Sequence, residues 1–199
     1  MIHPMSPAID HVIVCVPDLA KSVDAFESDH GVTSVPGGRH RGHGTANRLV
    51  PLGDAYIELV AVVDSGEAVR SAFGNWVVAR SSHPPADGIA IRTDDLDSVC
   101  ARLDLEAIAM SRPADDGEQL HWRIAGMERL VSAGLPFFIQ WDIAPERHPG
   151  AIPVSHPRGD VGLRRVVISG DIDQLQVWTL GTSGLELEGG EPGVRFELG

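Results

Sequence analysis

The sequence predicts an α+β protein made of repeated βαβββ modules. The first observation is a self-match, because residues 86–103 align with residues 9–26 without a gap, at a spacing of roughly 77 residues. The second is that each copy begins with an apolar strand and continues into an amphipathic helix. A third, shorter copy starts near Leu163. Because one copy alone would leave a sheet face bare, we expect the copies to pair their sheets.

The first module is expected over residues 8–64. Asp18 is a plausible N-cap for a helix that ends at Gly31, since a side-chain oxygen before an apolar stripe and a glycine after it are typical helix ends. The Gly53-Asp54 pair predicts a hairpin turn. Alternating or continuous apolar patterns predict the strands over residues 9–16, 32–35, 47–52 and 55–63.

The rest of the chain is divided in the same way. A connecting helix is expected over residues 65–85 and is ended by Pro84-Pro85. The second module is expected over residues 86–143 and a partial third over residues 163–199. Residues 144–162, which are rich in Pro and Gly, are expected to be a loop. The matching aspartates of the three copies predict helix N-caps at Asp18, Asp95 and Asp171.

Composition excludes several classes of protein. A net charge of −12 without a basic stripe argues against nucleic-acid binding. No apolar run is long enough for a membrane span, and residues 1–10 lack the pattern of a secretory signal, so we expect a cytoplasmic protein. Cys15 and Cys100 lie in apolar segments and are expected to be reduced thiols. Nucleophile-elbow, phosphate-loop and dinucleotide motifs are absent.

Glu58 is the most informative residue, because it alternates with the apolar residues of strand 55–63. An inward carboxylate is costly to bury, so Glu58 is at an edge in water, paired, or bound to something. His11 lies on one strand face with Ile13 and Cys15, and it is either a hydrogen-bonded core residue or the partner of Glu58. A carboxylate-oriented imidazole is a general base.

A glycine-rich segment from Pro36 precedes this strand and is expected to be a loop. It carries His40, His43, Thr45 and Asn47, and its glycines let the backbone approach a ligand closely. Alternatively, Asn and Thr side chains hold the turn through their own backbone. We interpret His43 as a surface residue.

Arginine and aromatic side chains complete the candidate set. Arg39 and Arg112 are candidates to clamp a carboxylate or an enolate, and both are equally consistent with solvated surface residues. Trp122 and Phe138 are candidates to line an apolar cup. By alternation, Phe138, Gln140 and Asp142 are expected on the inner face, with Phe137, Ile139 and Trp141 toward the helices.

Several segments resemble the vicinal oxygen chelate superfamily, which includes glyoxalases, extradiol dioxygenases and bleomycin-binding proteins. They resemble most narrowly its glyoxalase-like domain branch, and they are IDHVIVCVPDL, PGGRHRGHGTANRLVPL, YIELVAV, SRPADDGEQLHWRIAG and LPFFIQWD. The resemblance implies a cupped, barrel-like mixed sheet with helices outside. It also implies a ligand site in the cup between the first two modules.

The resemblance further implies four positions where metal-using members of the superfamily have their ligands. In this chain those positions are occupied by His11, Glu58, Gly88 and Gln140. This chain keeps the histidine and the carboxylate but has a glycine in the second module, and Gln140 is a weak neutral ligand. The metal ligands are therefore expected to be His11 and Glu58, with His40 as the candidate to join them. Mn²⁺, Mg²⁺, Ni²⁺ or Zn²⁺ are the possible cations.

Two functions of different classes remain open. The first is a metal-dependent lyase or isomerase for a small carbonyl or enol compound, with Glu58 and His40 catalytic. The second is a non-catalytic protein that binds or sequesters a partly aromatic small molecule. The expected ligand-binding residues are Arg39, Thr45, Asn47, Arg112, Phe138 and Gln140. A homodimer is expected, because a partial third module leaves sheet surface to cover.

Overall fold

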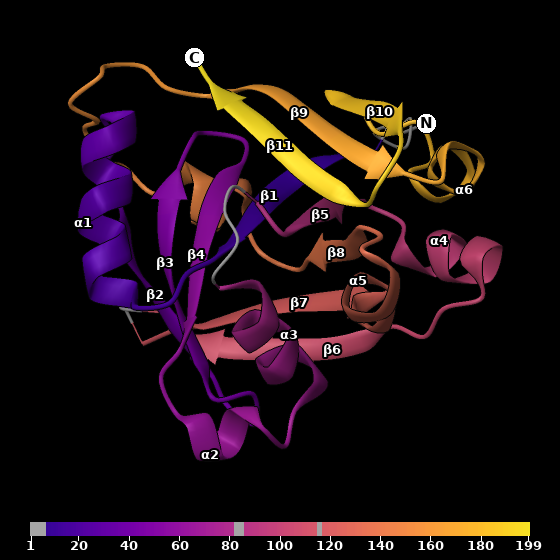
Figure 1. Cartoon of the computed structure of the whole chain (residues 1–199), viewed down its shortest axis with the longest axis horizontal. Helices are drawn as coiled ribbons and strands as arrows, with labels where there is room; N and C mark the ends of the chain where they lie inside the picture. The colour runs from indigo at the N-terminus through magenta and orange to yellow at the C-terminus, as the bar shows by residue number, and fades with distance from the viewer. Residues whose placement is uncertain (1–6, 82–85, 115–116) are drawn as a thin grey trace.

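A computed structural model describes residues 7–81, 86–114 and 117–199. Its main feature is an eight-stranded mixed sheet with the strand order β2-β3-β4-β1-β5-β8-β7-β6 (Figure 1). The strands of this sheet are β1 (Ala8–Cys15), β2 (Val35–His40), β3 (Thr45–Pro51), β4 (Tyr56–Val62), β5 (Gly88–Arg92), β6 (Ile108–Pro113), β7 (Gln119–Ala125) and β8 (Phe137–Trp141).

The two halves of this sheet have the same internal arrangement. β1 is parallel to β4 and β5 is parallel to β8, while β1 and β5 pair antiparallel and join the halves. In Figure 1 the strands of the first half run steeply and those of the second half run nearly horizontally. The outer strands β2 and β6 approach each other, since a Cβ added to Gly38 would lie 3.5 Å from Arg112 Cδ. The predicted fold class, a barrel-like α+β arrangement, is confirmed.

The sheet has two differently covered faces, which we call the α1 face and the site face. The α1 face carries Val12, Val14 and Leu59 and is covered by α1, α4 and the C-terminal part of the chain. The site face carries Ile13 and Cys15, and helices α3 and α5 pack against it. The helices are α1 (Leu19–His30), α2 (Ser65–Ala68), α3 (Ala72–Arg80), α4 (Leu96–Leu103), α5 (Met127–Ala133) and α6 (Ile172–Trp178).

Helix ends follow the predicted capping pattern. The side chain of Asp18 accepts a hydrogen bond from the backbone of Lys21, and Gly31 closes α1 in the left-handed conformation. Asp95 and Asp171 cap α4 and α6 in the same way. The expected helix over residues 65–85 is instead two helices, because Ser71 interrupts it and caps α3, and its last residues, 82–85, lie outside the described residues. α5 was not predicted.

The expected loop before Thr45 is largely strand. β2 runs as far as His40 and pairs with β3 from Thr45 onward, so only residues 41–44 form a turn. The consequence is that His40, Thr45 and Asn47 sit on a rigid hairpin rather than on a free loop.

The C-terminal part forms a three-stranded sheet with the order β10-β9-β11, which crosses the top of Figure 1. Its strands are β9 (Leu163–Gly170), β10 (Leu185–Gly189) and β11 (Gly193–Leu198). Val166, Ile168 and Trp178 join the core of the α1 face, so this sheet and α6 cover that face. The preceding linker contains two short 3₁₀ turns, η1 (Pro145–Arg147) and η2 (Pro149–Ala151).

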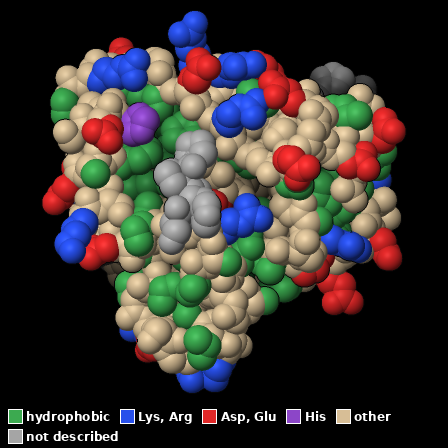
Figure 2. Space-filling view, viewed as in Figure 1, with side chains coloured by type: hydrophobic (Ala, Val, Ile, Leu, Met, Phe, Trp, Pro, Cys, Tyr) green, Lys and Arg blue, Asp and Glu red, His purple; other side chains and the backbone are tan. Residues whose placement is uncertain are grey.

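The surface shows no concentration of one charge on the face drawn in Figure 2, where acidic and basic side chains are intermixed. Within the described ranges, no helix has the length and apolarity that a membrane crossing needs. Cys15 and Cys100 are both free.

Candidate active site

A bulge in β1 places two polar side chains next to each other on the site face. The pairing of β1 with β5 shifts between Ile9 and His11, which leaves Asp10 as the extra residue. Asp10 is fully buried, and His11 is 4% exposed. Asp10 Oδ1 and His11 Nδ1 are 2.7 Å apart.

The second carboxylate oxygen of Asp10 is also occupied. Trp141 Nε1 donates to Asp10 Oδ2 over 2.9 Å, and His148 Nε2 lies 2.9 Å from the same oxygen. Burial by itself would raise the pKa of Asp10, but the hydrogen bonds from His11 and His148 outweigh it and lower that pKa below its ordinary value. Asp10 is therefore a buried, ionised carboxylate.

Glu58 faces His11 from the neighbouring strand, β4. His11 Nε2 lies 3.4 Å from Glu58 Oε2, and Glu58 is 7% exposed. The imidazole is held on both sides, because its ring stacks on Tyr56 at 4.5 Å and meets the edge of Phe137 at 5.6 Å. Burial raises the pKa of Tyr56 well above its ordinary value, so this phenol stays neutral.

The other oxygen of Glu58 is held by β2 and β3. Asn47 Nδ2 donates to Glu58 Oε1, and His40 Nε2 lies 3.4 Å from that oxygen. Although burial opposes it, the hydrogen bonds of His40 and Asn47 and the charge of His11 lower the pKa of Glu58 to about 2. His40 is oriented in turn by Thr45, with 2.9 Å between Nδ1 and Oγ1.

These contacts form one continuous chain of alternating imidazoles and carboxylates, which we call the acid–base chain. It runs through His148, Asp10, His11, Glu58 and His40. His40 is its most accessible member, with 28% of its side chain exposed. The inward position of Glu58 and its pairing with His11 agree with the sequence interpretation. Thr45 and Asn47 contact this chain and orient its members.

Gly37 makes the placement of Asn47 possible. The backbone nitrogen of Gly38 donates to Asn47 Oδ1, and a Cβ on Gly37 would lie 2.0 Å from that oxygen. Because such a contact is impossible, any larger residue at position 37 would displace the Asn47 side chain.

The two candidate arginines have different surroundings. Arg39 is on the surface and pairs with Asp64 and Glu67 over 3.1 and 3.0 Å, so it does not point at the acid–base chain. Arg112 is half-buried on β6, and its charge acts on Tyr56. Among the residues that the structure describes, Arg112 has no carboxylate partner within 4 Å.

His43, interpreted as a surface residue, is half-buried beside α3. Its Nδ1 lies 2.6 Å from Ser71 Oγ, and its ring meets the edge of Phe73. Burial lowers the pKa of His43. Its contacts are thus with α3 rather than with Glu58.

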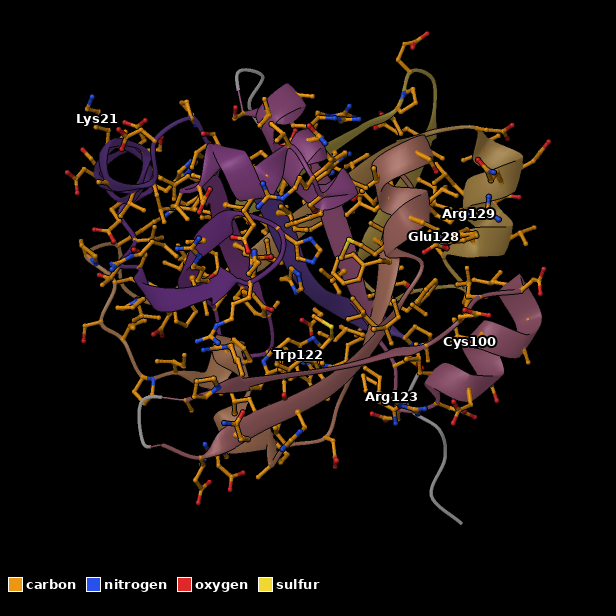
Figure 3. The ribbon with its side chains drawn as sticks, turned by 90° about the horizontal axis from the view of Figure 1, so that it is seen from below. Lys21, Cys100, Trp122, Arg123, Glu128 and Arg129 are labelled. Carbon is orange, nitrogen blue, oxygen red and sulfur yellow. The ribbon has the colours of Figure 1, made fainter. Side chains whose placement is uncertain are left out.

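The prediction that Phe138 and Gln140 face the cup is wrong. Phe138 lies in the core of the α1 face, and Gln140 Oε1 accepts hydrogen bonds from the backbone of Leu96 and from Arg123. Figure 3 shows Arg123 beside α4, the helix that carries Cys100. The strand pairing makes Phe137, and not Gln140, the counterpart of Glu58. Since strand side chains alternate, an alignment error of an odd number of residues exchanges the two faces. The residues of β8 that face the site are Phe137, Ile139 and Trp141.

The second half of the sheet has apolar surroundings at the positions that correspond to the polar residues of the first half. Ala90 pairs with Phe137 as Ile13 pairs with Glu58, so Phe137 is the counterpart of Glu58. At Gly88, the counterpart of His11, an added Cβ would lie 2.8 Å from Leu130 Cδ1. Trp122 and Trp141, which we call the aromatic wall, extend this apolar half, and their ring centroids lie 5.3 Å apart.

His11 and Glu58 present the donor atoms that bear on metal binding. His11 Nε2 and Glu58 Oε2 are 3.4 Å apart, close to the roughly 3.4 Å expected between two ligands on one tetrahedral ion. His40 lies at the other carboxylate oxygen, and within the described ranges no group of three or more His, Cys, Asp or Glu side chains could hold a metal ion. His11 and Glu58 supply two protein ligands at most, so a cation fits these residues only where water or substrate fills its other positions.

Two surface cavities lie away from the acid–base chain. One, of about 440 Å³, is lined by Arg80, Asp87 and Arg195 among others, and one of about 480 Å³ is lined mainly by the linker around Ile152. Among the members of the acid–base chain, His40 is the one that solvent reaches most.

Asp10 and His148 were missed by the sequence analysis. Asp10 aligns with Asp87 in the repeat, and an aspartate inside an apolar strand was the signal that could have identified it. No motif or spacing distinguishes His148 within its linker.

The rolled sheet of two βαβββ halves, with an acid–base chain built from β1, β4, the outer strand β2 and one linker histidine, defines a paired-module protein whose site lies on the sheet. The chain belongs to the glyoxalase-like domain family, whose model matches residues 9–180. The resemblance noted from the sequence is thereby confirmed.

Three solved structures are similar to this chain to different degrees. A hypothetical protein from Staphylococcus aureus is similar with a TM-score of 0.68 at 16% identity, covering 94% of this chain and 87% of that one. Methylmalonyl-CoA epimerase from Mycobacterium tuberculosis gives 0.49 at 21% identity, covering 70% and 89%. A hypothetical protein from Bacillus halodurans gives 0.49 at 13% identity, covering 70% and 96%. The search of curated proteins found no match.

Proposed function

We propose that this protein is an enzyme that moves a proton on a carbon next to the carbonyl group of a small molecule. The observation that carries the proposal is the fixed arrangement of His11, Glu58 and His40. Two imidazoles lie 3.4 Å from the two oxygens of one buried carboxylate. Burying these groups is costly, and a stable core does not require them.

His40 is the proposed proton carrier because it is the accessible end of the acid–base chain. When Thr45 accepts from Nδ1, the lone pair of His40 lies on Nε2, where Asn47 Nδ2 contacts it over 3.3 Å. This lone pair takes the proton from carbon once the substrate replaces the contact with Asn47. The C–H electron pair then forms the C=C bond of an enolate, and the negative charge moves to the carbonyl oxygen. Glu58 stays ionised at neutral pH and stabilises the imidazolium that results.

Arg112 is the proposed anchor for the ligand. Its guanidinium is a planar fork suited to a carboxylate or an enolate oxygen. The aromatic wall of Trp122 and Trp141 would accept an apolar part of the molecule. A small 2-oxo acid or hydroxyketone has this combination of groups.

A divalent cation belongs to this proposal, and His11 and Glu58 are the residues that would hold it. When bound, such a cation would polarise the carbonyl oxygen as a Lewis acid. Elemental analysis of untagged protein, purified without chelator, tests this directly. We expect stoichiometric metal that is lost in a His11→Ala/Glu58→Ala double variant.

The proton-transfer proposal is tested by deuterium uptake from D₂O into pyruvate, 2-oxobutyrate and dihydroxyacetone, followed by proton NMR with added Mn²⁺ or Mg²⁺. Loss of a general acid–base group typically costs about 10²- to 10⁴-fold in rate. We expect that loss in His40→Gln and Glu58→Gln. His43→Gln is the matched control, because His43 contacts Ser71 instead. Equal uptake in all four proteins would refute the assignment.

One observation favours the second candidate, a non-catalytic binding protein. At Gly88 and Phe137, Leu130 and an aromatic ring stand where polar counterparts of His11 and Glu58 would be. This function predicts tight binding of a partly aromatic ligand by metal-free protein without deuterium uptake. Under either function we propose a homodimer, which light scattering after size-exclusion chromatography would test.

A further inference from the structure

We infer that Asp10 is a positioning residue that keeps a proton on His11 Nδ1, and that the linker residue His148 holds Asp10 in place for this role. The inference deepens the proposed function, on which its catalytic meaning rests. Whether His11 Nδ1 carries a proton can be measured without any substrate.

Asp10 and His11 are in direct contact. An ionised carboxylate can only accept hydrogen bonds, so the 2.7 Å contact requires the proton to lie on His11 Nδ1. In the neutral ring the opposite nitrogen, Nε2, then presents its lone pair toward Glu58 Oε2 at 3.4 Å, and in the imidazolium it donates there. Two acceptors facing each other need a proton, a ligand donor or a cation between them. His11 is thereby kept ready to bind one.

Asp10 is held in turn by one side chain of the linker and one of β8. The backbone nitrogen of Gly150 donates to His148 Nδ1 over 3.1 Å, so the ring proton of His148 lies on Nε2, 2.9 Å from Asp10 Oδ2. Arg92 Nη1 lies 3.4 Å from the same nitrogen. Trp141 donates to the same oxygen. Asp10 Oδ2 therefore has two N–H donors, with Arg92 Nη1 3.9 Å away, and Asp10 Oδ1 accepts from His11. Tyr56 also forms a hydrogen bond with Asp10.

The linker is fixed to the main sheet beside His148. Gly53 donates from its backbone to the carbonyl oxygen of Gly150 over 2.9 Å, which ties the linker to the β3–β4 turn. A Cβ on Gly150 would lie 2.5 Å from the carbonyl oxygen of Ala55, so the two segments are in close backbone contact. His148 is 6% exposed and meets the rings of Tyr56 and Trp141 edge-on.

The decisive variant is Asp10→Asn. An asparagine has one acceptor and one NH₂ group in place of two acceptors. Two donors already point at the Oδ2 position, so the amide oxygen is expected there and the NH₂ group is expected to face His11. His11 Nδ1 must then become an acceptor, and its proton moves to Nε2, where it faces Glu58.

The experiment is ¹⁵N NMR of protein labelled at histidine, recorded above pH 7.5, about one unit above the ordinary pKa of imidazole. His11→Gln assigns the signals. We expect a protonated Nδ1 in the wild type and an unprotonated Nδ1 with a protonated Nε2 in Asp10→Asn. Asp87→Asn is the matched control, since Asp87 is the buried carboxylate at the corresponding position of the second copy and accepts from the Cys15 backbone. It should leave the His11 signals unchanged.

An unprotonated Nδ1 in the wild type would overturn the inference, and so would an unchanged His11 spectrum in folded Asp10→Asn. If Asp10→Asn does not fold, the wild-type spectrum and that of His148→Gln decide. Glutamine still donates to Asp10, so a protonated Nδ1 is expected in both. Binding of Mn²⁺ alone, by titration calorimetry, should weaken about 10- to 100-fold in Asp10→Asn. A moved proton with no Mn²⁺ binding in any protein would uphold the positioning role and refute the metal part of the proposed function.

Discussion

Replacing Gly37 by alanine should destabilise the protein through a side chain on the neighbouring strand. The new Cβ would lie 2.0 Å from Asn47 Oδ1 and 2.9 Å from the carbonyl oxygen of Asn47. The Asn47 side chain must rotate away, which removes its hydrogen bonds to Gly38 and to the buried Glu58. Hydrogen bonds to charged groups contribute about 1.5–3 kcal/mol.

Part of this loss is offset in the unfolded state. Alanine restricts the unfolded chain and typically adds about 0.4–1 kcal/mol to stability where the backbone permits it. The net loss should be about 1–2 kcal/mol. For a chain of this size, that corresponds to a melting temperature lower by roughly 2–8 °C.

Gly38→Ala is the matched control on the same strand, because its Cβ would meet Arg112 Cδ at 3.5 Å, an ordinary van der Waals contact. Circular dichroism melts of both variants and the wild type give the comparison. If Gly37→Ala, Gly38→Ala and the wild type have the same melting temperature, Asn47 does not hold Glu58 as described.

Three further results are expected. The pKa of Glu58 is lowered from 4.5 to about 2 in the folded protein, so its contribution to stability is complete above pH 4.5 and disappears as the pH falls toward 2. Urea unfolding at several pH values should show this loss, and Glu58→Gln should reduce the acid dependence. Gly88→Ala should cost about 1–3 kcal/mol by overpacking against Leu130, whose Cδ1 lies 2.8 Å from the added Cβ, and thermal melts test it. Arg112→Gln should raise KM for a 2-oxo acid about tenfold, the effect of roughly 1.4 kcal/mol, whereas Arg39→Gln should leave KM unchanged. Equal KM values in the two arginine variants would remove Arg112 from the ligand site.

The fold could be predicted because its signals are local and repeated. A gapless self-match, apolar strand patterns and three capping aspartates each depend on neighbouring residues only. Helix α5 escaped prediction because its N-cap, Gly126, makes no side-chain capping bond and its seven residues bury only Leu130. A weak pattern of this length does not distinguish a helix from a turn.

The site was predictable where a polar residue interrupts an apolar strand. Glu58 and His11 gave that signal, and His40 was identified as a candidate to join them. Phe138 and Gln140 were assigned to the wrong face because the start of β8 depends on which strand it pairs with, and pairing is a tertiary property. His148 had no detectable signal, since its position depends on contacts more than ninety residues away along the chain.

The origin of His148 limits how this protein can be divided. A chain shortened to end at residue 143 would retain all eight strands of the main sheet. It would nevertheless strip one hydrogen-bond donor from a fully buried carboxylate, Asp10, and uncover the core beneath Val166 and Trp178. The C-terminal part thus completes both the core and the hydrogen bonding of the paired modules.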